Sequence, residues 1–551
     1  MYGKLFSACL YGIDGRLIEV EVDLSNGIPH TSIVGLPDSA VREAVERVRS
    51  AIKNCGYAFP LQRVTINLAP ADLRKEGSAF DLAIALGILA ASNQIALPEE
   101  ERILMIGELS LDGLLRPVPG VISMVDLAKR QGFDAVLLPR DNAAEAMLIS
   151  GISIYGLKHL NDLSSDKEAS GSDYGVPSPG QKRGKALSRP RPPSGQAIKR
   201  PLVISSFNHL QCSASDASRS SPSPPASAGD YSDVLGQQHA KRALTIAAAG
   251  RHNIMLIGPP GTGKTMLIRR LPSILPDLTE EEALEVTKIY SSAGKLTETA
   301  TCLVRNRPFR APHHTISAAG LVGGGTIPRA GEVSLAHHGV LFLDELPEFT
   351  RSALEVLRQP LEERAVTISR SRASFTFPAS FMLAVSLNPC QCGFFGAQPP
   401  LPRCTCSPYR VAQYRERISG PLLDRIDMHV EVPLPVEWLN DKQPLSSQEM
   451  KEAALRAREL QQYRYRGLEI SSNSELSGRL LRQYAALDKE AEQLLAATFQ
   501  SLGLSMRAYD RIIKLSRTIA DLEGTNCISA GHVAEAIQYR QLDRRIADSI
   551  G

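Results

Sequence analysis

The stretch Gly258-Pro-Pro-Gly-Thr-Gly-Lys-Thr265 decides the fold of the chain, because it joins an apolar run to the beginning of a helical pattern. The preceding segment, Ile254–Ile257, is short and apolar enough to be a buried strand, and Met266–Leu271 has the pattern of a first helical turn. A strand, a glycine-rich turn, Lys-Thr and a helix form a phosphate cradle, because backbone N–H groups and the helix N-terminus attract an anion. The sequence therefore predicts a nucleotide site here.

The chemistry of each residue in this loop predicts how it contacts the nucleotide. Lys264 is expected to reach the β- and γ-phosphates, and Thr265 to offer its hydroxyl to Mg²⁺. ATP and Mg²⁺ are therefore the predicted cofactors. The predicted nucleotide-binding residues are Gly258, Pro259, Pro260, Gly261, Thr262, Gly263, Lys264 and Thr265.

Length and composition limit the classes of protein to consider. A chain of 551 residues is expected to hold several domains, at roughly one per 150 residues. Its net charge of +3 is too small to indicate nucleic acid by itself. No apolar run reaches the roughly 18 residues of a membrane span, and the N-terminus lacks a signal-peptide pattern, so no membrane partner is expected. Nine cysteines without a disulfide pattern, together with an ATP site, predict the cytoplasm.

Residues 1–163 alternate between strand and helix patterns and predict a compact α/β domain. Two alternating segments, Tyr2–Leu10 and Arg16–Leu24, flank a turn and predict a hairpin. Helical spacing follows Pro37, and Ala79–Ala91 predicts a second, more apolar helix.

Residues 164–229 differ in composition, being rich in Ser, Pro, Gly and basic residues, and predict a disordered tether. The part from Lys182 to Arg200 contains seven basic residues and no acid. A solvated linker is the simpler interpretation, and an electrostatic arm for nucleic acid is the alternative. The short apolar segment Leu202–Phe207 is expected to dock on a neighbouring surface.

Residues 230–432 carry two more apolar strands that end in polar side chains. In Gly339–Glu345, apolar residues precede two acids, so we expect Asp344 to hold the water shell of Mg²⁺ and Glu345 to activate the attacking water. Asn388 follows the apolar run Phe381–Leu387, where its amide can contact the γ-phosphate. A strand that ends in solvated acids, and an asparagine that begins a turn, are the simpler alternatives.

An alternating segment after these acids, Val366–Phe377, predicts a hairpin with basic residues near its tip. Arg370 and Arg372 are therefore candidates for DNA binding through phosphate contacts. The alternative is an ordinary solvated hairpin edge, which commonly carries basic side chains.

Four of the cysteines occur close together in a loop rich in Gly and Pro. Four thiolates are the right number for a structural zinc site, and they leave no open position for catalysis. Free or redox-active thiols are the alternative. The predicted zinc ligands are Cys390, Cys392, Cys404 and Cys406.

Residues 433–551 have helical patterns throughout and predict a helical lid. Helices are expected at Ser446–Arg466, Leu487–Leu502, Ala508–Leu522 and His532–Tyr539. Arg507 lies just before the third of these helices.

The core and the lid together resemble the AAA+ ATPase superfamily. The order of Lys264, then Asp344 and Glu345, then Asn388 matches its Walker A, Walker B and sensor 1 motifs. The resemblance implies that Arg425, in Leu-Leu-Asp-Arg-Ile-Asp, is an arginine finger for the neighbouring subunit, and that Arg507 is the sensor 2 arginine. A homo-oligomer with shared sites is therefore implied. A surface salt bridge of Arg425 with Asp424 or Asp427 is the alternative.

The first domain resembles the proteolytic domain of Lon proteases. The segments that carry this resemblance are Lys75–Asp81, Gly107–Gly113 and Pro117–Gly120. That family uses a Ser-Lys dyad, but the lysine position holds Ile122 and the serine position aligns to Ala79, with Ser78 one place away. Because a free hydroxyl is a weak nucleophile without a base, the resemblance implies an inactive scaffold.

Nearly the whole chain outside the linker is similar to the YifB/ComM family of magnesium-chelatase-like ATPases. This resemblance implies a P-loop AAA+ core with a Lon-protease-like (S5-type) α/β N-terminal domain and an α-helical C-terminal lid of the magnesium-chelatase type. It further implies a hexameric ring motor on single-stranded or branched DNA, promoting branch migration in recombination and natural transformation. A magnesium-chelatase motor subunit that remodels a protein partner, and an ATP-dependent protease, are the alternatives.

Overall fold

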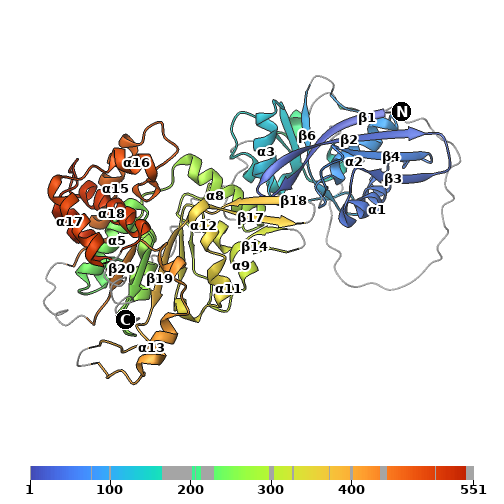
Figure 1. The fold of residues 1–551 in the computed structure, drawn as a ribbon. Helices are drawn as coiled ribbons and strands as arrows, with labels where there is room; N and C mark the ends of the chain where they lie inside the picture. Colours follow the sequence, from blue (N-terminus) through green and yellow to red (C-terminus); the bar gives the residue numbers. More distant parts are fainter. Residues whose placement is uncertain are drawn as a thin grey trace, which may run out of the picture. The chain divides into compact units, whose positions relative to one another are not determined.

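The computed structural model describes residues 2–75, 77–98, 101–163, 202–204, 207–212, 229–296, 303–325, 328–370, 373–397, 401–434, 444–502 and 504–540. Contacts divide the chain into two compact units, Met1–Ser220 and Ser221–Gly551, and the boundary falls within the predicted linker (Figure 1). The basic segment from Lys182 to Arg200 lies outside the described residues. None of the helices in the described ranges is long and apolar enough to cross a bilayer.

The first unit is built on a seven-stranded mixed sheet with the order β10-β9-β6-β1-β2-β4-β3. The predicted hairpin is present, because its first two strands pair in antiparallel register from Tyr2↔Asp23 to Tyr11↔Asp14. The strands of this sheet are β1 (Tyr2–Tyr11), β2 (Asp14–Ser25), β3 (His30–Val34), β4 (Arg63–Ala69), β6 (Ile103–Met105), β9 (Ala135–Pro139) and β10 (Ser153–Leu157).

Helices of the first unit pack on this sheet through the apolar residues that predicted them. The side chain of Asp38 caps α1 by accepting a hydrogen bond from the N–H of Val41 at 2.7 Å. Nearly every residue of α2 is buried, which explains its apolar composition. The helices and short strands are α1 (Ser39–Asn54), α2 (Asp81–Ala91), α3 (Val121–Arg130), α4 (Ala143–Ala146), β5 (Ile95–Ala96), β7 (Glu108–Leu109) and β8 (Leu115–Arg116).

A segment from the predicted linker also belongs to the first unit. Strand β11 (Leu202–Val203) pairs in parallel with β5, and Ile204 and Phe207 are buried against the same core. The prediction of a tether over all of residues 164–229 is therefore wrong for 202–204 and 207–212. The apolar side chains of this segment gain more from burial than they lose in conformational freedom.

The second unit contains a five-stranded parallel sheet with the order β13-β16-β19-β12-β20. Three central strands are buried on both faces, which accounts for their continuous apolar sequences. In register, Ile257 pairs with Leu387 and Leu343 with Val385, so the carboxyl ends of these strands meet at one edge. The strands are β12 (Ile254–Ile257), β13 (Phe309–Arg310), β16 (Val340–Leu343), β19 (Met382–Leu387) and β20 (Met428–Glu431).

Helices surround this sheet, and one of them is divided by a proline. The predicted helix after the phosphate loop ends at Arg269, and a second begins at Leu271 with Pro272 in its first turn. Further along, Thr279 and Glu282 form a capping box, as a threonine followed three residues later by a glutamate at the start of a helical pattern predicts. The helices are α5 (Gln238–Gly250), α6 (Lys264–Arg269), α7 (Leu271–Ile274), α8 (Glu280–Ser292), α9 (Ala318–Val322), α10 (Glu332–Leu335), α11 (Arg351–Glu355), α12 (Arg358–Glu363), α13 (Pro408–Arg415) and α14 (Gly420–Leu423).

Two antiparallel pairs of strands in the described part of the core lie outside the five-stranded sheet. Strands β14 (Gly323–Gly324) and β15 (Arg329–Ala330) form a short antiparallel pair. Strands β17 (Ala365–Arg370) and β18 (Ala373–Pro378) form the predicted basic hairpin, in register from Ala365↔Pro378 to Arg370↔Ala373. Figure 1 shows this hairpin as an arm that extends away from the sheet.

The C-terminal helices pack on α5 and extend the core of the second unit (Figure 1). Polar contacts reinforce this packing. Gln461 donates a hydrogen bond to the carbonyl of Ala249 at 3.1 Å, and Arg511 pairs with the buried Asp427 at 3.3 Å. The helices are α15 (Ser447–Arg464), α16 (Gly478–Tyr484), α17 (Lys489–Leu502), α18 (Met506–Leu522) and α19 (Ala530–Gln538).

Candidate functional site

The phosphate loop lies between β12 and α6, at the carboxyl edge of the parallel sheet. A Cβ atom on Gly258 would meet the carbonyl oxygen of Val432 at 2.2 Å, so only glycine fits there. Gly261 and Gly263 have φ angles of 81° and 87°, in the left-handed region that favours glycine. These three positions explain why the loop needs its glycines.

Lys264 is held inside this loop by carbonyl groups. Its Nζ donates hydrogen bonds to the carbonyls of Gly258 at 2.7 Å and Pro259 at 2.8 Å, and to Oδ1 of Asn388 at 3.2 Å. The residue is only 8% exposed, and burial lowers the pKa of its ammonium group. The Asn388 contact joins the predicted Walker A lysine to the predicted sensor residue across two adjacent strands.

Asp344 accepts hydrogen bonds from three directions at the end of β16. Thr265 Oγ1 lies 3.1 Å from one carboxylate oxygen, while Ser386 Oγ and the N–H of Glu345 bond to the other. The two predicted Mg²⁺ ligands, Thr265 and Asp344, are therefore adjacent. A hydroxyl and a carboxylate in this arrangement suit an octahedral Mg²⁺ that keeps several waters.

Glu345 has an unusual backbone conformation, with φ 54° and ψ 51°. A non-glycine residue in the left-handed region is uncommon, and such residues cluster at functional sites. Its side chain is 56% exposed, and His314 Nδ1 lies 3.8 Å from its carboxylate. The position of His314 beside the predicted catalytic carboxylate is a finding of the structure that no local sequence pattern indicated.

Sequence reasoning also overlooked Ser386, which orients Asp344. A signal was available, because Ser386 is two residues before Asn388 and therefore on the same side of β19. It is a small polar residue in an otherwise apolar strand, and it is buried. The structure thus brings together Lys264, Thr265, Asp344 and Asn388 as predicted, and adds Ser386.

The two predicted phosphate-sensing arginines converge elsewhere, on Glu362 of α12. Arg425 is 9% exposed, donates to the carbonyl of Pro421 at 2.6 Å and bonds to Glu362 Oε1. Arg507 is 61% exposed and lies 3.8 Å from the same carboxylate oxygen. Within the described residues, no hydrogen bond or ion pair joins either arginine to Lys264 or Asp344.

The alternative partners considered for Arg425 were the neighbouring acids of its own motif. Asp427 instead accepts a hydrogen bond from the N–H of Asn253 at 2.9 Å and pairs with Arg511. The carboxylate bound to Arg425 is Glu362, which is distant in sequence. A salt bridge is therefore present, but with a partner that sequence proximity did not indicate.

The hairpin arginines are described only in part. Arg370 is the last residue of β17 and pairs in register with Ala373, so the basic positions are at the tip of the hairpin. Arg372 and the side chain of Arg370 lie outside the described residues.

The four clustered cysteines lie close enough together to share one metal ion. Sulfur separations are 3.3 Å for Cys390–Cys392, 3.7 Å for Cys390–Cys404 and 3.5 Å for Cys392–Cys404, and Cys406 is in the same group. A tetrahedral zinc site with Zn–S bonds of about 2.3 Å has sulfurs about 3.8 Å apart. The donor set therefore fits zinc.

This cysteine loop also touches the phosphate loop. A Cβ atom on Gly393 would meet Cδ of Pro260 at 2.7 Å, so the two backbones approach closely. Since Cys390 follows Asn388 by two residues, the cysteine loop is positioned to support both sides of the nucleotide site.

A second cluster of possible metal ligands, made of one glutamate and two histidines, does not fit a metal ion. His337 and His338 both contact Glu285 Oε2 through Nε2, at 3.1 and 2.8 Å. However, His337 Nδ1 accepts the N–H of Ser380 at 3.0 Å, so its proton is on Nε2 and points to the glutamate. A neutral imidazole in that tautomer has no free lone pair for a cation at Nε2.

The Lon-like region lacks a lysine next to its serine. Ile122 is fully buried in α3, and Ser78 Oγ bonds to the carboxylate of Glu108. The nearby Lys75 is buried and donates to the carbonyls of Pro70 and Leu73. These contacts do not form a Ser-Lys dyad.

Comparison with known proteins gives matches along most of the chain. Residues 230–438 match the family model "Magnesium chelatase, subunit ChlI", residues 20–142 match "Subunit ChlI of Mg-chelatase" and residues 444–540 match its C-terminal model. YifB of Salmonella typhimurium is 42% identical over 536 residues, covering 97% of this chain and 96% of YifB. Competence protein ComM of Haemophilus influenzae is 41% identical over 545 residues, covering 98% and 97%. Lon protease 2 of Bacillus subtilis is 29% identical over 180 residues, covering 29% and 32%.

Replacing Ser386 tests whether the fixed orientation of Asp344 matters for the metal. In Ser386→Ala, Asp344 loses a hydrogen bond, so we expect about 10–100-fold weaker activation of ATP hydrolysis by Mg²⁺. Hydrolysis rates measured across a Mg²⁺ titration check this. Ser292→Ala is the control, because that hydroxyl bonds only to the carbonyl of Ile289 at the end of α8. An unchanged Mg²⁺ midpoint in Ser386→Ala would contradict the assignment.

Proposed function

The chain belongs to the family of magnesium-chelatase-like AAA+ ATPases that includes YifB and ComM, and on that premise we propose that it is an ATP-hydrolysing ring motor acting on DNA. Two contacts support the proposal of ATP hydrolysis: the hydrogen bond of Thr265 to Asp344 and that of Lys264 to Asn388. Reduced thiols and ATP use fit a cytoplasmic protein.

The proposed reaction is hydrolysis of the γ-phosphate by an attacking water. Lys264 contacts the β- and γ-phosphates, while Thr265 and Asp344 hold Mg²⁺, which neutralises charge on the phosphates when bound. Glu345 orients the water and accepts its proton, and Asn388 positions the γ-phosphate from the adjacent strand. The exposure of Glu345 leaves its carboxylate accessible to that water.

Two arginines complete the site from a neighbouring subunit. Arg425 and Arg507 share the Glu362 carboxylate, so the lid and the core present both guanidinium groups at one place. We assign both to the nucleotide of the adjacent chain in a homo-oligomer, with six subunits as the expected number. An arginine in that position stabilises transition-state charge and is worth about 10³–10⁵ in rate in related chemistry.

DNA is the proposed substrate because of similarity over nearly the whole chain to a protein named for competence. The basic tip of the β17–β18 hairpin supplies the matching chemistry, since guanidinium groups bind backbone phosphates without reading sequence. Branch migration in recombination is the proposed use of this motor. The absence of a dyad at Ser78 and Ile122 does not favour the protease alternative.

Stimulation of ATP hydrolysis by DNA tests this function. We expect single-stranded or branched DNA to raise the hydrolysis rate, and the double variant Arg370→Ala/Arg372→Ala to lose most of that increase while keeping its basal rate. Arg466→Ala, an exposed arginine of the lid, is the control. Because contacts with DNA phosphates should supply most of the binding free energy, the increase in hydrolysis rate caused by DNA should weaken steeply between about 50 and 200 mM salt. No stimulation and no DNA binding at low salt would rule out a DNA motor.

We also propose that the cysteine loop holds one structural zinc ion through Cys390, Cys392, Cys404 and Cys406. Four thiolates saturate a tetrahedral ion, so its contribution is to fix the loop that abuts Pro260.

Elemental analysis of the purified protein tests this zinc site. About one zinc per chain is expected, lost in Cys404→Ser and retained in Cys55→Ser, whose thiol lies in the first unit. Loss of zinc should also weaken ATP binding, because the support of the phosphate loop is lost. A metal-free protein with unimpaired ATP binding would contradict the proposal.

A further inference from the structure

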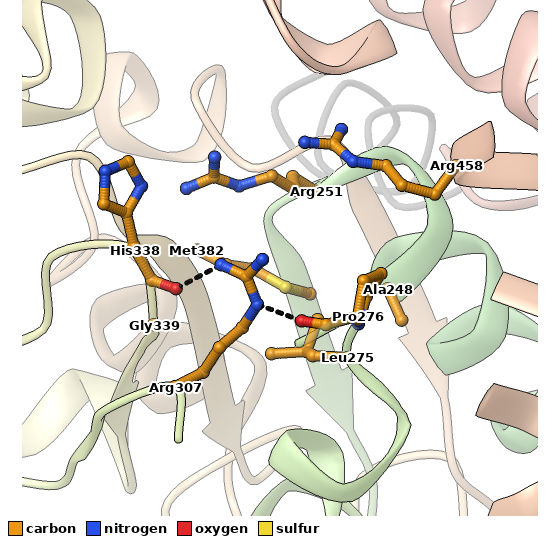
Figure 2. A pocket seen from close by; sticks show the side chains of 9 residues that line it. All are labelled: Ala248, Arg251, Leu275, Pro276, Arg307, His338, Gly339, Met382 and Arg458. Atoms are coloured by element: carbon orange, nitrogen blue, oxygen red, sulfur yellow. Dashed lines mark hydrogen bonds between the residues drawn. The ribbon is translucent and has the colours of Figure 1, made fainter. Parts of the chain in front are cut away.

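A small cavity lies at the sheet edge opposite the nucleotide site. Met382 begins β19, Gly339 directly precedes β16 and Arg251 precedes β12, so the cavity is at the amino ends of these strands. Figure 2 shows that the guanidinium groups of Arg251, Arg307 and Arg458 come to it from three different segments. Its free space is about that of one water molecule.

Arg307 and Arg251 differ in how well they are paired. Arg307 donates to the carbonyl of His338 at 2.6 Å, bonds to the carbonyl of Pro276 and pairs with Glu282 at 3.1 Å. Arg251 donates to the carbonyl of Ser380 at 3.3 Å, but both of its carboxylate neighbours are 3.9 Å away. Arg251 therefore lacks a close anionic partner among the described residues.

Arg458 is the least satisfied of the three. It comes from α15, is 6% exposed, and its buried Nη1 has no hydrogen-bond partner within the described residues. A buried guanidinium without a partner is costly, because its hydration has been lost and no interaction replaces it. A second partner is therefore expected at this nitrogen.

The charges around the cavity leave an excess of positive charge. Two carboxylates, Glu282 and Glu475, are close to four arginines. Three of these arginines line the cavity, and the fourth, Arg364, pairs with Glu475 at 2.6 Å. The next acid, Glu285, is engaged by His337 and His338. Burial, together with the charge of Arg307, lowers the pKa of Arg251 to about 10, as expected where positive charges are crowded.

The backbone of Arg251 supports a specific role for its side chain. It caps α5 with φ 57° and ψ 41°, a left-handed position where glycine is the usual residue. An arginine there is strained, and the strain is tolerated where the side chain makes an interaction that glycine would lose.

From these observations we propose that the cavity is a binding site for a small monatomic anion of the halide class, held by Arg251 and Arg458. A water molecule can accept hydrogen bonds from both but cannot balance their charge, and a polyatomic oxyanion would exceed the free space by more than a monatomic anion does. Arg458 belongs to α15 of the lid, and Arg251 belongs to the core, just before β12. An anion bound by both arginines therefore stabilises the packing of α15 against the core. The site is separate from the nucleotide loop and does not depend on the proposed function.

Thermal unfolding of the full chain without nucleotide tests this site. Replacing gluconate by chloride at constant ionic strength should raise the unfolding midpoint of the second unit by about 1–2 °C, which corresponds to about 1 kcal/mol of ligand stabilisation for a unit of this size. Arg458→Met, which keeps the apolar stem, should lose this increase. In gluconate it should be at least as stable as the parent protein, since an unpaired charge is removed.

The matched control is Arg456→Met, an exposed arginine two residues away on the same helix. It should respond to chloride like the parent protein. Crystals soaked in bromide should give an anomalous peak between Arg251 and Arg458. An equal chloride response in Arg458→Met, no bromide peak in the cavity, or a carboxylate from another chain in its place would each overturn the proposal.

Discussion

Parallel pairing of β12, β16 and β19 is the constraint on which the candidate site depends. Strands β16 and β19 each contribute the residue that follows their last apolar position, and β12 leads into the phosphate loop that carries Lys264 and Thr265; the register places all three carboxyl ends at one edge. The contacts of Lys264 with Asn388 and of Thr265 with Asp344 follow from that alignment. A slip of one residue in β16 would turn Asp344 to the other face and break its contact with Thr265, and a slip in β19 would do the same to Asn388 and its contact with Lys264.

The lysine, hydroxyl, carboxylates and amide of the candidate site meet at this edge, whereas the two arginines proposed to neutralise transition-state charge lie at Glu362. Arg507 comes from the lid and Arg425 from the core, so a movement between lid and core would change what both arginines can reach. In the proposed ring, coupling between ATP hydrolysis and movement would then pass through this pair.

Local sequence patterns predicted much of this architecture. Apolar runs, glycine turns and the capping box at Thr279 depend on neighbours in sequence, and the structure confirms them. Partners distant in sequence were not predictable, because nothing local relates Arg425 to Glu362 or identifies Arg458 as buried. Within the linker, the apolar run Leu202–Phe207 predicted a docked segment, and its pairing with β5 confirms this, whereas the average composition of the linker predicted only a tether.

A nucleotide site that uses residues of two chains should be restored when two inactive variants are mixed. Arg425→Ala lacks the finger but keeps a complete phosphate loop, and Lys264→Ala keeps the finger but lacks the lysine. Each alone should hydrolyse ATP very slowly, and their mixture should regain part of the parent rate, because some interfaces then pair an intact loop with an intact finger. A mixture that is no more active than either variant, although the chains co-assemble, would contradict a shared site.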